Sequence, residues 1–117
     1  MALYNSFRGI VLAAEEGLAI ASALGDKKAA LLQNHGLLTC GQSIESTVFW
    51  FVSLEKCCQV QLLADAAAGG RGSETVKIDE EDAVYTYKTV GSEKAGWFSA
   101  RPEFDVMERE SRGEYKN

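Results

Sequence analysis

The chain has 117 residues, with 12 Lys and Arg against 17 Asp and Glu, so its formal net charge is -5. This length suits one domain, and 46% apolar with 25% charged residues is typical of a globular protein rather than a disordered one. No stretch is long and apolar enough to cross a membrane, and an acidic chain repels phosphate backbones. Membrane insertion and nucleic-acid binding are therefore disfavoured.

The first half of the chain begins with a predicted strand and helix. Residues 8–13 form a short apolar run of strand length, and apolar residues then recur at helical spacing over about residues 14–24. Glu15 and Glu16 fall in the first turn of that helix, where its dipole favours negative charge. Gly25 stands where a left-handed C-terminal cap belongs, so we expect the helix to end there.

Two short apolar runs, 29–33 and 37–40, flank the tripeptide Asn34-His35-Gly36. Asn and Gly tolerate positive φ angles, so this pattern predicts two strands joined by a tight turn with His35 near its apex.

A long helix follows this hairpin. Ser43 is a good N-cap, nothing breaks a helix from Ile44 to about Ala68, and the glycine pair 69–70 is expected to end it. About 25 residues at ~1.5 Å each give a rod of ~37 Å. Its apolar positions occupy more than one stripe, so it must be covered from several sides, which the rest of the chain can hardly do.

The second half is less regular. Residues 69–73 indicate a flexible linker rather than a phosphate-binding loop, and 79–82 open a short helix rather than a calcium loop. From Gly91 onward the mixture of aromatics, charges and the single proline, Pro102, suggests a tail that lies on a surface. Trp97 and Phe98 in that tail are either a binding patch or an anchor onto the body, and an anchor is the more common outcome.

His35 is the single histidine, and so the side chain expected to titrate near neutral pH. Two interpretations remain open: a polar residue that fills a turn, or a metal ligand or general base. A catalytic zinc needs three protein ligands, which one histidine cannot provide, and no Ser-His-Asp arrangement is identifiable.

The three cysteines, Cys40, Cys57 and Cys58, make an odd count with two adjacent, which is not a disulfide framework. Adjacent side chains on a helix diverge by ~100°, so Cys57 and Cys58 cannot both face one ion. We expect all three to be small core residues of a cytoplasmic protein.

The segment AALLQNHGLLTCG, residues 29–41, followed by a long helix with Phe49-Trp50-Phe51, resembles the class II aldolase/adducin family. Its uncharacterised fungal-type members are the most similar. Matches at residues 9–12, 15–17 and 23–25, and weaker ones at 85–88, 96–98 and 101–102, extend the resemblance to nearly the whole chain, from about Tyr4 to about Glu108.

The resemblance implies an α/β fold, layered α/β/α around a largely antiparallel sheet, and assembly as a homotetramer. Family enzymes hold a divalent metal, usually zinc, through a His-x-His pair and a third histidine from the turn that matches His35. The metal polarises the substrate carbonyl while a glutamate exchanges the proton, and the enzymes cleave or epimerise sugar phosphates. The adducin branch has no metal site and serves the actin–spectrin cytoskeleton.

The chain departs from the family pattern in its extent. It contains no His-x-His, no matching catalytic glutamate and no phosphate-binding loops. Residues 1–90 are therefore expected to be the C-terminal half of a class II aldolase-like domain, followed by the tail 91–117. His35 is carried over as the third metal ligand, and no catalytic or substrate-binding residue is identifiable.

Three functions stay open. The first is a metal-dependent carbon–carbon lyase for a sugar or sugar phosphate, truncated and inactive alone. The second is an adducin-like interaction module of the actin cytoskeleton, and the third is a remnant without a function of its own.

Overall fold

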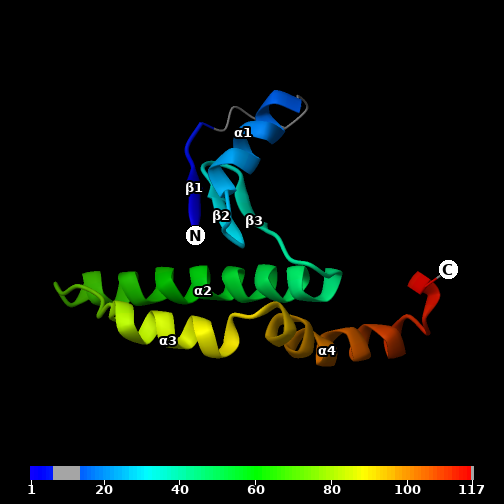
Figure 1. The fold of residues 1–117 in the computed structure, drawn as a ribbon. Coiled ribbons are helices and arrows are strands. Elements are labelled where there is room, and N and C mark those ends of the chain that lie inside the picture. Colours follow the sequence, from blue (N-terminus) through cyan, green and yellow to red (C-terminus); the bar gives the residue numbers. More distant parts are fainter. Residues whose placement is uncertain (7–13, 117) are drawn as a thin grey trace.

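The computed structural model describes residues 1–6 and 14–116, which form two layers (Figure 1). One layer contains a helix and three strands: β1 (Ala2–Tyr4), α1 (Ala14–Leu24), β2 (Ala29–Leu32) and β3 (Gly36–Thr39). The other layer contains three longer helices and a final 3-10 helix: α2 (Ile44–Gly70), α3 (Glu80–Val90), α4 (Glu93–Glu110) and residues Glu114–Lys116. In the view of Figure 1, α3 and α4 run beneath α2.

The sheet has the order β1-β2-β3, with β1 parallel to β2 and β3 antiparallel to it. One face packs against α1 and forms the small core, made of Ala2, Ile20, Leu24, Ala30 and Leu32. The first half of α2 packs against β3. The mixed α/β class expected from the sequence is confirmed, with one parallel strand pair beside the antiparallel hairpin.

The predicted helix and the two predicted strands of the hairpin that precede α2 are confirmed. The helix predicted over residues 14–24 is α1, and it ends at Gly25, which has a φ of 57°. The two predicted strands are β2 and β3. The strand predicted over residues 8–13 lies outside the described residues.

The long helix is confirmed and begins as predicted. The Ser43 hydroxyl accepts a hydrogen bond from the Ser46 N–H at 3.1 Å, and the Ser46 side chain accepts one from the Ser43 N–H, a complete capping box. The helix also ends at the glycine pair, as predicted, because its last residue is Gly70 and its C-cap is Arg71. The turn that follows uses Gly72, with a φ of 66°.

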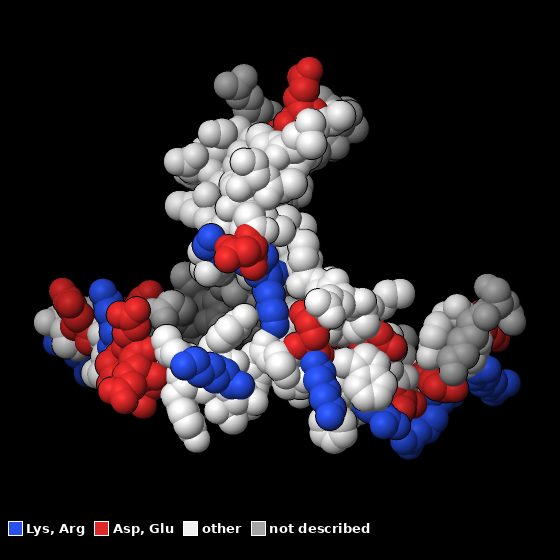
Figure 2. Space-filling model, in the orientation of Figure 1, with Lys and Arg blue, Asp and Glu red and all other residues white. Residues whose placement is uncertain are grey.

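The short helix expected after residues 79–82 is α3, with the Asp79 carboxylate accepting from the Asp82 N–H at 2.9 Å. Every residue of α3 is exposed. In Figure 2, acidic side chains gather over its start, while the sheet layer shows few charges on the same face.

The segment interpreted as a tail contains the 18-residue helix α4, capped by Ser92. Pro102 lies inside it rather than at a break. The helix packs against α2 through its small buried residues, Gly96 and Ala100, while Trp97 and Phe98 are 42% and 66% exposed. Of the two expected roles, an anchor or a binding patch, the anchor is not carried mainly by these aromatics, because the buried residues of α4 are the small Gly96 and Ala100.

Across residues 1–6 and 14–116, no helix is both long enough and apolar enough to span a bilayer.

Candidate functional site

His35 lies at the apex of the turn between β2 and β3, and its side chain is exposed. The two residues that flank it have positive φ angles, 61° at Asn34 and 152° at Gly36, which these residue types adopt readily. The His35 N–H donates to the Leu32 carbonyl at 3.0 Å and closes the turn. The imidazole is therefore carried by a short, hydrogen-bonded connection, as the sequence predicted.

The end of β1 lies beside this turn. Tyr4 is the register partner of Leu32, and the Gln33 N–H donates to the Tyr4 carbonyl at 2.9 Å. The parallel pairing of β1 with β2 thus brings the chain that leaves β1 to the same end of the sheet as His35.

Within the described ranges, no group of three or more His, Cys, Asp or Glu side chains is placed to hold a metal ion. A catalytic zinc site uses three protein ligands. His35 therefore fits such a site as one exposed donor, and the described residues do not complete the set around it.

The three cysteines do not join His35. All are free thiols, with Cys40 and Cys57 exposed and Cys58 half-buried. Their interpretation as core residues was wrong, because Cys40 follows the end of β3 and the other two lie on α2 where little of the described chain covers it.

A polar cluster that sequence reasoning missed surrounds Lys28, just before β2. Its ammonium donates to the Gly91 carbonyl and lies 3.6 Å from a Glu93 carboxylate oxygen. It also stands over two aromatic rings, 4.7 Å from the Trp50 centroid and 5.6 Å from that of Tyr87. One lysine thus connects the sheet layer to α2, α3 and α4, through partners too distant in sequence for any local pattern to reveal.

Glu93 is the acidic member of this cluster. Its Oε2 accepts from the Gln42 N–H at 3.0 Å and from the Ser46 hydroxyl at 2.7 Å. These two hydrogen bonds to the charged form, and then the nearby Lys28 ammonium, hold the pKa of Glu93 below its ordinary value, against an opposing effect of burial. The cluster therefore joins the sheet layer to the helical layer through hydrogen bonds and an ion pair.

The fold, the hairpin and the matching sequence together define a class of protein. The chain belongs to the class II aldolase and adducin family, whose sequence profile, the Class II Aldolase and Adducin N-terminal domain, matches residues 3–62.

Individual relatives carry different activities in their names. The chain is 44% identical over 100 residues to decarboxylase NovR of Streptomyces niveus, covering 86% of this chain and 35% of that protein. It is 42% identical over 100 residues to the 4-hydroxy-3-prenylphenylpyruvate oxygenase/4-hydroxy-3-prenylbenzoate synthase of Streptomyces roseochromogenus subsp. oscitans, covering 86% and 34%.

The solved L-fuculose 1-phosphate aldolase from Glaciozyma antarctica PI12 has a TM-score of 0.81 and 48% sequence identity to the chain. The match covers 97% of this chain and 40% of that one. The chain therefore spans about a third of the length of these two Streptomyces relatives and two fifths of this solved relative. Because the relatives bear the names of an oxygenase, a decarboxylase and an aldolase, family membership defines the fold but not one reaction.

Proposed function

We propose that this chain is part of a metal-dependent class II aldolase-type lyase, in which His35 supplies one of the imidazoles that hold the metal. The supporting observation is the exposed His35 at a closed turn, in a fold with a TM-score of 0.81 to an L-fuculose 1-phosphate aldolase. A donor carried between two paired strands has a defined direction, as a metal ligand needs.

A divalent metal, zinc by the family resemblance, would polarise the carbonyl of a sugar or sugar-phosphate substrate and so favour cleavage of a carbon–carbon bond. The part of His35 is to bind that ion through a neutral ring nitrogen, so acid competes with the metal for it. Because one imidazole holds a metal only weakly, we propose that the chain is inactive until further polypeptide supplies the other ligands.

Exposed apolar side chains support association with such polypeptide. Leu62 and Leu63, in the second half of α2, are 70% and 71% exposed, and side chains of this kind are stabilised by cover. We propose a homo-oligomeric assembly, and a cytoplasmic one because all three thiols are free.

The test combines this chain with the segment of the Glaciozyma antarctica aldolase that it does not match, by co-expression. Zinc per complex and cleavage of L-fuculose 1-phosphate are measured for the unchanged chain, for His35→Ala and for the neighbouring Gln33→Ala control. We expect about one zinc in the first and third complexes and at least ~10-fold less with His35→Ala. The 117-residue chain by itself is expected to hold no stoichiometric zinc.

Equal zinc in the His35→Ala complex would contradict the assignment of this ligand. Tightly held zinc in the isolated chain, unaffected by His35→Ala, would contradict the incomplete site. Size-exclusion chromatography reports whether the two polypeptides associate, so a failure to assemble is recognised separately from a failure to bind metal.

A second candidate, an adducin-like interaction module, is favoured by the same exposed α2 side chains, since they can serve a partner without any catalysis. Cosedimentation with actin filaments tests it. Retention of the chain with the filaments, weakened by Leu62→Ser and not by Gln33→Ala, would support this function over the lyase.

A further inference from the structure

A hollow of about 550 Å³ lies where the first turn of α2 meets one face of α4 and the C-terminal 3-10 helix. Three aromatic residues line it, Trp97, Phe104 and Tyr115. Trp97 and Tyr115 are 42% and 52% exposed, so both residues are partly accessible from solvent. None of the lining residues belongs to the hairpin that carries His35.

The α4 wall of this hollow is a single helical stripe. Trp97, Arg101, Phe104, Asp105 and Glu108 follow one another at spacings of three or four residues, or fewer where the stripe widens, so they share one face. Gly96 and Ala100 face α2 instead and bring the two helices close.

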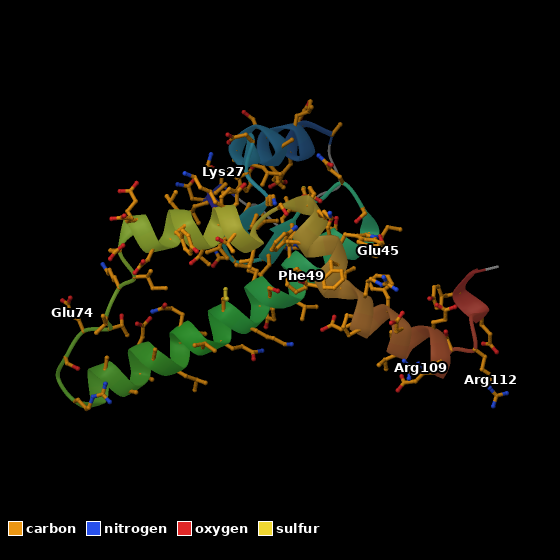
Figure 3. All side chains as sticks on the ribbon, turned by 60° about the horizontal axis from the view of Figure 1, so that its bottom comes forward. Lys27, Glu45, Phe49, Glu74, Arg109 and Arg112 are labelled. Atoms are coloured by element: carbon orange, nitrogen blue, oxygen red, sulfur yellow. The ribbon has the colours of Figure 1, made fainter. Side chains whose placement is uncertain are left out.

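Charge in the hollow is predominantly negative. The carboxylates of Glu45, Asp105 and Glu108 line it against the single guanidinium of Arg101. Glu45 lies at the start of α2, while the basic residues Arg109 and Arg112 stand further along toward the C-terminus (Figure 3). Among the ion pairs formed by the described residues, none involves Glu45 or Asp105. The hollow thus combines aromatic rings with an excess of carboxylates over cations.

Arg101 shows which kind of group this environment attracts. Its guanidinium carbon lies 5.7 Å from the centroid of the Trp97 ring, a cation–π distance. A cation from the chain itself therefore occupies part of the aromatic surface.

We propose that this hollow is a binding site for a small organic cation with an apolar body, of the alkylammonium class. The face of Trp97 would contact the cationic group, Glu45 and Asp105 would neutralise its charge, and Phe104 and Tyr115 would cover the apolar part. Arg101 is an internal competitor for the same ring. This assignment is independent of the lyase proposal, because it uses neither His35 nor a metal.

The probe is choline, and its matched control is 3,3-dimethylbutan-1-ol, a neutral molecule of the same shape. Each is titrated into the full chain while the indole resonance of Trp97 is followed by NMR, with the Trp50 indole as an internal reference. We expect choline to shift the Trp97 resonance and to bind at least ~5-fold more tightly than the neutral molecule. Equal binding of the two, or no shift at Trp97, would overturn the proposal.

Three substitutions test the charges. Asp105→Asn should weaken choline binding about 3-fold, because one attractive carboxylate is lost. Arg101→Gln should tighten it about 2-fold, because a competing cation is removed from the Trp97 ring. Glu103→Gln, on α4 but outside the hollow, should leave it unchanged.

The tightening by Arg101→Gln cannot arise from partial unfolding, so it keeps the proposal testable even if another variant is unstable. Weaker binding in Arg101→Gln, or an effect of Glu103→Gln equal to that of Asp105→Asn, would contradict a site at this place.

Discussion

The two halves of α2 are both helical, but they differ in how far other elements of the chain cover them. The first half begins with the Ser43 capping box, and the Thr39 hydroxyl of β3 donates to the Thr47 carbonyl at 3.1 Å. It also carries Trp50, which contacts α4 and Lys28. Beyond about residue 55, nearly every side chain of the helix is exposed until Ala68.

This difference shows that α2 is stabilised from one end by tertiary contacts. Most helical stability in proteins comes from packing of an apolar face rather than from intrinsic propensity. The second half retains the apolar residues Val60, Leu62 and Leu63 without that packing. The chain covers 40% of the solved aldolase relative, so more than half of that relative has no counterpart in this chain. The bare half of α2 is therefore the region where additional polypeptide would change stability most.

Removing one large side chain from each half should give the largest contrast. Trp50→Ala deletes the ring that contacts Lys28 and Gly96, and we expect a loss of about 3 kcal/mol in the free energy of unfolding. Leu63→Ala, in the second half, should change it by less than about 0.5 kcal/mol. Urea unfolding followed by circular dichroism measures both. Similar losses in the two variants would show that the second half is covered in solution.

The polar cluster around Lys28 and Glu93 should give the next largest effect on stability, and this effect should depend on pH. Glu93→Gln removes the charge that Lys28, Ser46 and the Gln42 N–H stabilise, and we expect a loss of about 1–2 kcal/mol at neutral pH. Because the pKa of Glu93 is lowered on folding, its contribution is complete above the ordinary carboxyl pKa and disappears as pH falls through the lowered value.

Unfolding free energies measured from neutral pH down to about pH 3 should therefore converge for Glu93→Gln and the unchanged chain. Glu103→Gln, an exposed carboxylate of the same helix, is the control and should follow the unchanged chain throughout. A gap between Glu93→Gln and the unchanged chain that persists in acid would mean that the carboxylate charge is not what stabilises the contact.

Two glycines should give the smallest individual effects, and the two effects should differ in sign. A Cβ on Gly96 would lie 2.7 Å from Cζ2 of Trp50, whereas one on Gly69 would meet nothing within 4 Å. Gly96→Ala should destabilise the chain by about 1 kcal/mol, since overpacking exceeds the gain in helix propensity. Gly69→Ala should stabilise it by about 0.5–1 kcal/mol. Thermal unfolding of both variants tests the pair, and stabilisation by Gly96→Ala would argue against a close α2–α4 contact.

The predictions that succeeded depend on neighbours in sequence. Gly25 ends α1, Asn34 and Gly36 form the turn at His35, and Ser43 caps α2, each through hydrogen bonds or φ angles within a few residues. The role of His35 as a metal ligand stays a prediction, since a metal site is formed by residues that only a complete tertiary structure brings together.

The amino-acid sequence by itself determined where α1, the hairpin and α3 lie, where α2 begins, and which family the chain resembles, because caps, turns and apolar spacing act locally. Tertiary structure decided that Gly96 of α4 packs against Trp50 of α2, 46 positions away in the sequence. It likewise decided that Lys28 contacts Glu93, 65 positions away. It also decided that Cys40, Cys57 and most of the second half of α2 stay exposed. Such contacts depend on the path of the whole backbone, which no local pattern of residues encodes.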